Sequence, residues 1–308
     1  MEKNELSRQI KEKAAAHGFI ACGIAQAQYL EKYARAFDKW IDQGYQADMQ
    51  YMENYSEKRK DPQKLMPGAQ SVISVLYNYY PDKELPKNDN YHISRYAYGK
   101  DYHFVLKDKL KALLSDVEEF AGETNSRVFV DTAPVLDRAW AEMAGIGWIG
   151  KNSMLINPKH GSYVFIGEII TDLVLDYDAP MNNFCGGCTK CIEACPTEAI
   201  IKDGIIDSNK CISYWTVENK TESMPQELAD KFEDNIFGCD ICQEVCPWNK
   251  FAKPHDQPAF EPHEALRNMN KEKWQVLTEE QYRVLFKKSA VKRAKFKGVQ
   301  RNIDFLNP

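Results

Sequence analysis

The stretch CGGCTKCIEACP, residues 185–196, decides the fold of the middle of this chain, and CDICQEVCP, residues 239–247, repeats its end. The first stretch spaces its cysteines C-x2-C-x2-C-x3-C before a proline, and the second spaces them C-x2-C-x3-C before a proline. Thiolates two residues apart can bind neighbouring irons of one cubane, and the fourth cysteine of such a run usually binds a second cluster. Together with Cys211 this makes eight cysteines. They predict two 4Fe-4S clusters in a ferredoxin-like domain of the bacterial type.

The crossover of the fourth cysteine assigns the ligands of each cluster. One cluster is then held by Cys185, Cys188, Cys191 and Cys246, and the other by Cys195, Cys211, Cys239 and Cys242. The alternative is a pair of structural zinc sites with four cysteines each. Zinc ribbons use two separated pairs and have no use for the third cysteine or the Cys-Pro, so the pattern favours clusters. The ninth cysteine, Cys22, lies in an apolar stretch and is predicted to be a small buried residue.

Length and composition place these motifs in a larger globular protein. The 308 residues suggest about two domains, and 44% hydrophobic with 28% charged residues is typical of a soluble chain. Nowhere do about 18 apolar residues follow one another, and the start MEKNELSRQIKEK mixes both charge signs. We therefore expect a cytoplasmic protein with no membrane partner, whose thiols stay reduced.

The residues before the cysteines predict an α+β domain over residues 1–176. Strands are expected at 19–25, 71–80, 127–132, 153–157 and 163–171, with helices at 30–44, 103–121 and 133–145. The glycines of AGIGWIGK, residues 144–151, are expected to end the last of these helices. The ferredoxin-like domain is placed at 177–254, and a helical, basic C-terminal segment at 255–308.

Asp131 is the candidate for chemistry in the first domain. It stands where the apolar run VFV gives way to an expected helix, a place where side chains often face a ligand crevice. Alternatively, Asp131 or Thr132 could cap the helix that Pro134 opens. No G-x-G-x-x-G follows a strand, and no D-x-H-x-x-G run is present. A nicotinamide site is therefore unsupported, and any bound corrinoid should lack a histidine lower ligand.

These motifs in combination resemble the epoxyqueuosine reductases, which are cobalamin-dependent enzymes of tRNA modification. The resemblance is carried by VDTAPVLDRAWAEMAGIGWIGKNSMLI, residues 130–156, by GSYVFIGEIITD, residues 161–172, and by the two cysteine stretches. It implies a nitroreductase-like fold for the first domain, base-off cobalamin between that domain and the clusters, and Asp131 as the proton donor. The corrinoid contacts that it implies are Arg59, Asp131, Asn152, Leu155, Ile166, Ser213, Trp215 and Asp240. Arg59 could instead be a solvated helix end, and Trp215 could be core.

The resemblance also implies the reaction. Epoxyqueuosine at the wobble position of tRNA is reduced to queuosine in the last step of queuosine biosynthesis, with two electrons that an external low-potential donor delivers through the clusters. An acid near the epoxide oxygen must hold a proton at neutral pH, so we expect burial to raise the pKa of Asp131. The rival functions are a cobalamin-dependent reductive dehalogenase and a ferredoxin-type electron carrier without a substrate.

A basic stretch is the candidate tRNA contact. The net charge of −5 argues against a nucleic-acid binder, but residues 287–301 carry seven Lys and Arg and no acid. Helical spacing over 274–298 would place Lys288, Lys292 and Lys295 on one face. The alternative is a solvated surface helix. The chain also stops at Pro308, without the helical repeats that longer members of the family append.

Overall fold

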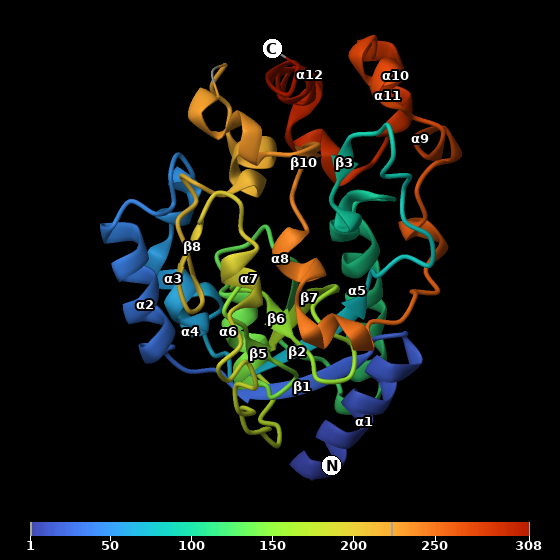
Figure 1. Ribbon diagram of the computed structural model, residues 1–308. Coiled ribbons are helices and arrows are strands. Elements are labelled where there is room, and N and C mark those ends of the chain that lie inside the picture. The colour runs from blue at the N-terminus through green and yellow to red at the C-terminus, as the bar shows by residue number, and fades with distance from the viewer. Residues whose placement is uncertain (1, 223, 308) are drawn as a thin grey trace.

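A four-stranded antiparallel sheet forms the centre of the first domain in the computed structural model, which describes residues 2–222 and 224–307. The strands lie in the order β1-β2-β7-β4, so that β2 and β7 are internal (Figure 1). Their bounds are β1 Ala21–Gln26, β2 Ser71–Asn78, β7 Val164–Thr171 and β4 Ser126–Phe129. All four were expected from the sequence.

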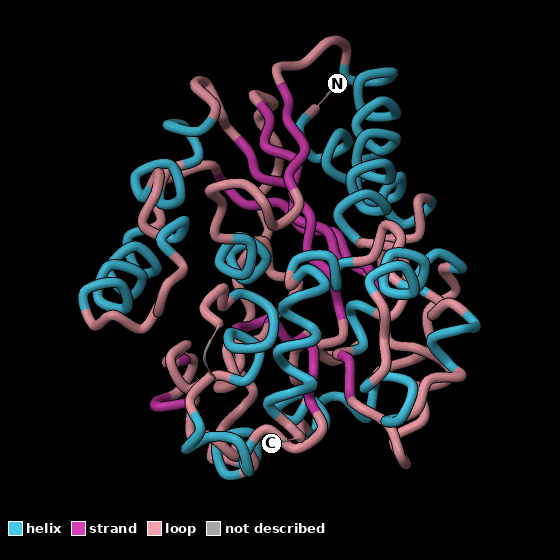
Figure 2. Tube along the Cα trace, turned by 90° about the horizontal axis from the view of Figure 1, so that it is seen from above, coloured by secondary structure: helices cyan, strands magenta, loops and turns pink. Residues whose placement is uncertain are grey.

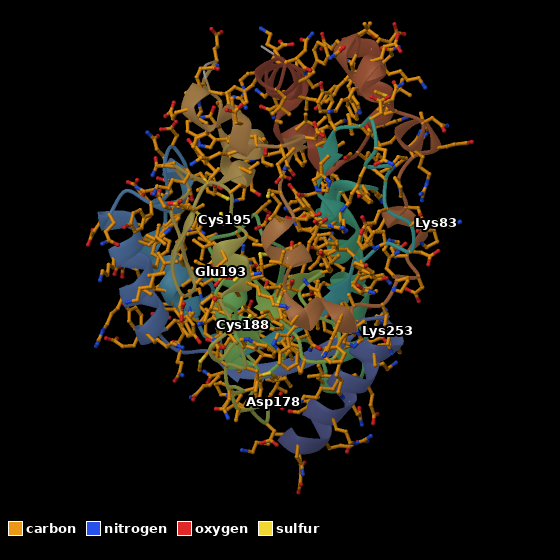
Figure 3. All side chains as sticks on the ribbon, viewed as in Figure 1. Lys83, Asp178, Cys188, Glu193, Cys195 and Lys253 are labelled. Carbon is orange, nitrogen blue, oxygen red and sulfur yellow. The ribbon has the colours of Figure 1, made fainter. Side chains whose placement is uncertain are left out.

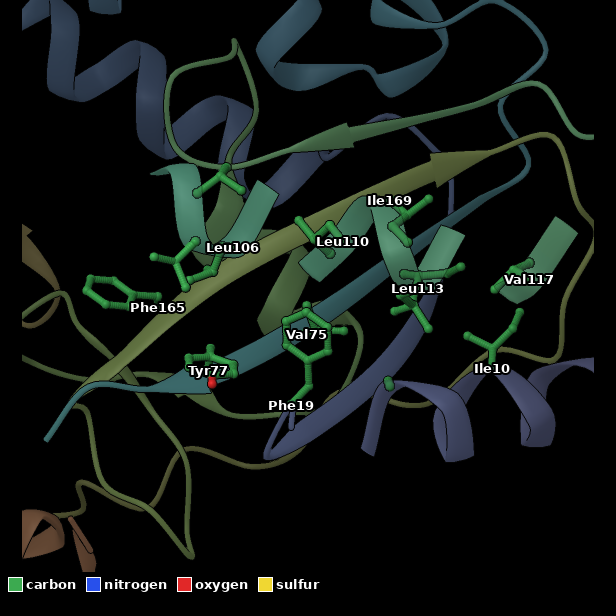
Figure 4. Packing of buried hydrophobic residues seen from close by; sticks show 14 of the residues in the cluster. Ile10, Phe19, Val75, Tyr77, Leu106, Leu110, Leu113, Val117, Phe165 and Ile169 are labelled. Carbon is green, nitrogen blue, oxygen red and sulfur yellow. The ribbon is translucent and has the colours of Figure 1, made fainter. Parts of the chain in front are cut away.

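Helices cover both faces of this sheet. One face carries α1 (Lys3–Ala16) and α5 (Tyr102–Ala121), whose apolar side chains interlock with Val75 and Ile169 (Figure 4). The other face carries α6 (Asp137–Met143), with Trp140 against Val72 and Ile170. Because both faces are covered, β2 and β7 are buried along nearly their whole length.

A close contact sets the position of α6. A Cβ on Gly23 would lie 2.0 Å from the carbonyl oxygen of Ala144, so only glycine lets the end of this helix rest on β1. Gly145, at φ +69°, then ends the helix as predicted. The start of α6 differs from the prediction, because residues 131–136 form a bent segment and the helix begins at Asp137.

The cysteine region is built of short elements beside this domain. It holds helices α7 (Lys190–Glu193) and α8 (Ile241–Glu244), a hairpin of β8 (Ile200–Lys202) and β9 (Ile205–Ile206), and a π-helical turn at Tyr214–Glu218. Figure 3 labels Cys188 and Cys195, which come from the two ends of α7. In Figure 1, α7 and α8 lie side by side in the middle of the molecule.

The C-terminal segment shares a second hydrophobic core with two distant parts of the chain. Trp274, Phe286 and Ile303 are buried against Ile93 and Phe237. The last two come from β3 (His92–Ile93) and β10 (Asn235–Phe237), which pair in parallel. The helices of this segment are α9 (Glu264–Arg267), α10 (Lys271–Gln275), α11 (Glu279–Leu285) and α12 (Lys295–Phe305).

The remaining elements complete the part of the chain that the structure describes. They are α2 (Glu31–Asp42), α3 (Ser56–Lys60), α4 (Pro62–Leu65), β5 (Trp148–Ile149), β6 (Leu155–Ile156) and six short 3-10 helices. Seen from above, helices surround the strands, and the two chain ends lie on opposite sides of the view (Figure 2). Within the described residues, none of the helices has the length and apolar character needed to span a bilayer.

The continuous helix expected over 274–298 is absent. Lys288 and Lys295 have left-handed φ values of +58° and +62°, and they separate α11, a 3-10 turn at Ala290–Arg293 and α12. Burial of Phe286 and Val291 fixes this path, and the Ser289 hydroxyl accepts a hydrogen bond from the Val291 N–H to start the turn. The expectation that Lys288, Lys292 and Lys295 share one helix face is therefore wrong.

Candidate functional site

Asp131 lies in the bend between β4 and α6, in a left-handed conformation with φ +54°. Its side chain does not cap the helix, because α6 begins six residues later without a side-chain cap. The alternative reading of Asp131 as an N-cap is thus excluded. Instead the carboxylate faces the start of α5, and 61% of the side chain is exposed. A strained backbone that presents an exposed carboxylate is typical of a functional position.

Two residues in the first turn of α5 hold this carboxylate. The Tyr102 hydroxyl donates to Asp131 Oδ2 at 2.6 Å, and His103 Nε2 lies 3.3 Å from the same oxygen. The ring of Tyr102 is itself fixed by stacking on Phe165, with ring centroids 4.2 Å apart. The N–H groups at the start of this long helix add a partial positive charge. The arrangement therefore favours the ionised form of Asp131.

The pKa of Asp131 is accordingly lower than that of an ordinary aspartate. Its partly enclosed position opposes ionisation, but hydrogen bonds from His103 and Tyr102 and the charges of His103 and Arg138 outweigh that effect. The expectation of a raised pKa is therefore wrong for the protein without its substrate. That expectation took account of the apolar strand before Asp131 but not of the hydrogen-bond donors Tyr102 and His103.

His103 carries the proton that Asp131 lacks. Burial lowers the pKa of His103, but hydrogen bonds to Asp101 and Asp131 raise it to about 9. Asp101 accepts from His103 Nδ1 at 2.6 Å and also caps α5 by accepting from the His103 N–H. At neutral pH the site is therefore an imidazolium between two carboxylates, and the imidazolium has a direct hydrogen bond to Asp131.

Basic and aromatic side chains surround this carboxylate. Arg59, in α3, is only 9% exposed and donates to the Tyr51 carbonyl at 2.8 Å, so it is not a solvated helix end. Its Nε is buried and has no partner among the described residues. Burial lowers its pKa, and the charges of Asp137, Tyr51 and Asp131 act against that effect, so the guanidinium lies near all three.

The eight cysteines of the motifs fall into two groups that interact electrostatically. Burial raises the pKa of Cys191, as do the neighbouring Cys246, Cys185 and Cys188. Burial likewise raises the pKa of Cys242, as do Cys239, Cys211 and Cys195. These are the same two sets that the crossover rule gives. Four thiols that come together from distant loops suit an iron–sulfur cluster.

The two groups differ in depth. Cys185, Cys188, Cys191 and Cys246 line a cavity of about 340 Å³, with Phe184 and Phe251 at 51% and 40% exposure on its wall. We call this the outer set. The inner set, Cys195, Cys211, Cys239 and Cys242, lies next to the buried Asp240. Backbone N–H groups point at its sulfurs, such as that of Ala199 at 3.3 Å from Cys195 Sγ. Cys22, by contrast, is partly buried in β1 against the first core.

Three of the expected corrinoid contacts touch the loops of the inner set. Asn152 donates to the carbonyl of Cys242 at 3.2 Å, Ser213 interacts with Cys211, and Asp240 follows Cys239. Asp240 is engaged elsewhere, since it accepts from the Arg95 backbone N–H at 2.9 Å and from its guanidinium at 3.0 Å. Although burial opposes its ionisation, contacts with His92 and Arg95 lower the pKa of Asp240.

Three further expected corrinoid contacts lie in apolar surroundings. Leu155 is 2% exposed in a small cluster with Leu76, and Ile166 packs against the same cluster. The Trp215 ring packs against the core around Phe232, and its Nε1 donates to the Asn209 carbonyl at 2.8 Å. The alternative that Trp215 is a core residue therefore agrees with how its ring packs.

The basic segment lies beside the residues that hold Asp131. The Lys288 carbonyl accepts from the Asp101 N–H at 2.7 Å, which ties it to the residue that holds His103. Arg293 pairs with Glu218 at 2.6 Å and lies over the Tyr51 ring, 5.5 Å from its centroid. Lys288, Lys292 and Lys295 are exposed, and no ion pair to them is found among the described residues.

An antiparallel sheet with an exposed carboxylate held by a tyrosine and a histidine, beside two ferredoxin-type cysteine sets, defines an iron–sulfur oxidoreductase. Residues 59–132 match the family model of epoxyqueuosine reductase QueG, and residues 184–249 match a 4Fe-4S double cluster binding domain. The chain is 51% identical over 304 residues to the epoxyqueuosine reductase of Cellulophaga algicola, with 99% of each covered. It therefore belongs to the epoxyqueuosine reductase family and binds two 4Fe-4S clusters. The resemblance and the predicted fold class are confirmed.

Solved structures agree with this assignment. An epoxyqueuosine reductase with an epoxyqueuosine-modified tRNA-Tyr stem loop superposes with a TM-score of 0.91 at 31% identity, over 98% of this chain and 80% of that one. The epoxyqueuosine reductase of Bacillus subtilis superposes with a TM-score of 0.88 at 30% identity, over 98% of this chain and 81% of that one. In that structure the catalytic loop with an aspartate is swung out of the active site.

Sequence reasoning missed the partners of Asp131. The run Asp101-Tyr102-His103 was considered only as a cobalamin motif and set aside. Its position at the start of an amphipathic helix was the available signal, since the first residues of a helix point beyond its end and commonly face a ligand.

Proposed function

We propose that this protein reduces epoxyqueuosine to queuosine at the wobble position of tRNA, the last step of queuosine biosynthesis, with Asp131 as the acid. The observation that carries the proposal is the exposed Asp131 carboxylate held by Tyr102 and His103, in a chain of the epoxyqueuosine reductase family. The reaction removes the epoxide oxygen as water and consumes two electrons and two protons. An acid beside that oxygen is therefore required.

The charge state of the site suits an acid that works only on bound substrate. Asp131 is ionised while water reaches it, but the neighbouring His103 holds a proton at neutral pH. Substrate and cofactor that cover the exposed side chain remove its water, and desolvation raises the pKa of a carboxylate. His103 is within reach to pass its proton to Asp131 at that moment. Tyr102 keeps the carboxylate oriented.

Cobalamin would bind between Asp131 and the inner cysteine set. The buried Nε of Arg59 without a partner offers a hydrogen bond on the side of Asp131, while Asn152, Ser213 and Asp240 lie at the inner set. Ile166 and Trp215, which are partly buried, would provide apolar contact, and Leu155, whose side chain is buried, would contribute through its backbone. No histidine motif for a lower ligand is present, so the cofactor would bind base-off. Bound cobalamin supplies a cobalt centre for electron transfer to the substrate.

The depths of the two cysteine sets give the electron route a direction. An external low-potential donor would reach the outer set, which lies beside the exposed Phe184 and Phe251. The inner set would carry electrons onward toward Asp131. Burial raises the pKa of Tyr96, as do the charges of Asp131 and Asp240, so Tyr96 lies near both carboxylates. We place this chemistry in the cytoplasm, where the tRNA substrate is made.

The tRNA would bind along the basic segment beside the crevice. Lys288, Lys292 and Lys295 are exposed there, and Lys288 is one hydrogen bond from Asp101. Each phosphate contact contributes about −0.7 to −0.9 to the slope of log affinity against log salt. Replacing the three lysines by glutamine should therefore flatten this slope by about 2. An unchanged slope would place the tRNA elsewhere.

The decisive experiment uses the anaerobically purified protein with its clusters. We expect about eight iron and eight sulfide per chain, from two cubanes. Added cobalamin should give the visible spectrum of base-off Co(II), and an anticodon stem loop carrying epoxyqueuosine should be converted to the queuosine form under strong reductant. A protein with full clusters, bound cobalamin and no conversion would refute the proposed function.

A further inference from the structure

Three polar side chains lie side by side in the apolar layer between the sheet and α6; two are fully buried, and the third, Asp137, is half-buried with its Oδ1 covered. Along β2 and β7, Ser74 and Glu168 are register partners, and both are 0% exposed. Neighbours on the same side of these strands, such as Val72 and Ile170, are core residues. Asp137, the first residue of α6, lies over Glu168, and the two carboxyl groups interact directly.

These groups lack the partners that buried polar groups require. Among the described residues, eight buried side-chain atoms have no hydrogen-bond partner, and four of them are Ser74 Oγ, Asp137 Oδ1 and both Glu168 carboxyl oxygens. A buried unpaired polar group costs about 1 to 3 kcal/mol, and a buried charge costs more. So dense a cluster at two neighbouring strands and one helix start points to a role beyond packing.

The carboxyl pair can avoid this cost only by holding a proton. Two carboxylates in contact cannot both be ionised in a medium without water, but one shared proton makes each a partner for the other. Burial and the charge of Asp131 raise the pKa of Asp137 to about 6, and burial and the charge of Asp137 raise that of Glu168 further. Ser74 is the register partner of Glu168, but its hydroxyl makes no hydrogen bond to it.

The pair lies next to the acid of the active site. Asp131 is the charged group outside the pair that acts on both members, and it belongs to the bend that leads directly into Asp137. Arg138 and Arg59 face the Asp137 side, while β4 contributes only Phe129 opposite Glu168. The polar line from β7 to the crevice is therefore Glu168, Asp137, Asp131.

We propose that Asp137 and Glu168 form a buried proton store that recharges Asp131 during the reaction. This inference rests on the proposed function. The epoxide, two electrons and two protons give the alkene and water. The first proton goes from Asp131 to the oxygen as one C–O bond breaks. The second is needed on the same oxygen as the other C–O bond breaks, while substrate still covers the crevice. The pair transfers its proton to Asp131 for that step and regains one from solvent after release.

A spectroscopic test needs no turnover. The infrared carbonyl stretch of a protonated carboxyl group should be present in the wild-type protein at pH 7.5 and lost in Glu168→Gln. The matched control is Glu142→Gln. Glu142 is a buried glutamate in α6, its carboxylate accepts hydrogen bonds from the Tyr33 hydroxyl and the Ile149 N–H, and it makes no hydrogen bond to Asp137 or Glu168. This control should leave the band unchanged. A wild-type protein without the band would overturn the proposal.

The kinetic test is single-turnover reduction by pre-reduced enzyme loaded with cobalamin, measured from pH 6 to pH 9. The store is filled below the upper pKa of the pair and empties as pH rises through it, so the wild-type rate should fall at high pH. Glu168→Gln should be slower by about tenfold or more at pH 7.5 and should lose that limb of the profile. Asp137→Asn is the second variant if Glu168→Gln fails to fold. It should have the same effect.

The outcomes separate this inference from the function beneath it. Suppose that both variants keep the wild-type rate and pH profile while Asp131→Asn is inactive. The pair would then have only a structural role, and the proposed function would stand. If Asp131→Asn is itself fully active, the assignment of the acid fails instead, and the store has no group to recharge.

Discussion

The two faces of the central sheet have the same strands but different tasks. Toward α1 and α5, the buried side chains from the strands are apolar from Val75 to Ile169, except for Ser71 and Thr171 at the strand ends, whose hydroxyls are hydrogen-bonded. Toward α6, the same strands place Ser74 and Glu168 among apolar neighbours, and the bend before α6 presents Asp131. Since alternate residues of a strand face opposite sides, one sheet can hold a rigid scaffold and a reactive layer. The difference teaches that function here lies where the apolar alternation is broken.

The strongest way to break this comparison is Asp131→Asn. The change keeps the shape of the side chain but removes the transferable proton, so single-turnover reduction should fall by about 10²-fold or more. Clusters, cobalamin and tRNA binding should persist. Asp116→Asn on α5, a surface carboxylate paired with Lys13 and His17, is the control and should act as wild type. A near wild-type rate for Asp131→Asn would assign the proton to another group.

A substitution on the face toward α1 and α5 should lower the stability of the protein and leave the rate of the reaction unchanged. Leu110, fully buried on α5, packs against Gly167 of β7, where a Cβ would lie 2.9 Å from its side chain. Leu110→Ala should lower the free energy of unfolding by about 3 kcal/mol through loss of apolar contact and a cavity. Chemical denaturation at several pH values should give the same loss at each. A rate per folded molecule below wild type would show that the two faces are coupled.

Most of the scaffold could be predicted from the sequence, and most of the site could not. The strands β2 and β7 were readable because long Val and Ile runs have few other uses, and the cysteine sets because iron ligation fixes their spacing. The start of α6 was misread because Pro134 favours a helix start, whereas the chain bends to present Asp131. The partners Tyr102 and His103 lie about 30 residues from Asp131, and no local pattern indicates such a contact.

The reactive layer should also make stability depend on pH. The pKa of His103 rises on folding from 6.5 to about 9, so its contribution is fully present below pH 6.5 and is lost as pH rises through about 9. His103→Asn should remove about 1 to 2 kcal/mol at pH 6 and little at pH 10. Thermal unfolding across this range checks it, with His160→Asn as the control. Equal losses at both ends would show a packing effect only.

Ser74→Ala should give the smallest change. It deletes a buried hydroxyl that has no hydrogen-bond partner, so the free energy of unfolding should change by less than about 1 kcal/mol, and it can rise. Denaturant titration against wild type measures this. A loss of 2 kcal/mol or more would mean that the hydroxyl is a required donor to Glu168 and that this face is more tightly organised than its contacts indicate.

The pairing of β3 with β10 sets an order of events during synthesis. His92 of β3 pairs with Asn235, so the stretch around it must wait for about 140 further residues. At about 5 to 20 residues per second, that delay is about 7 to 30 s. During this time Ile93 and its apolar neighbours lack their partners. Both clusters are also incomplete, because Cys246 of the outer set and Cys239 and Cys242 of the inner set follow Asn235 in the chain. The last ligands of both clusters therefore leave the ribosome at the same stage of synthesis as the strand with which β3 pairs.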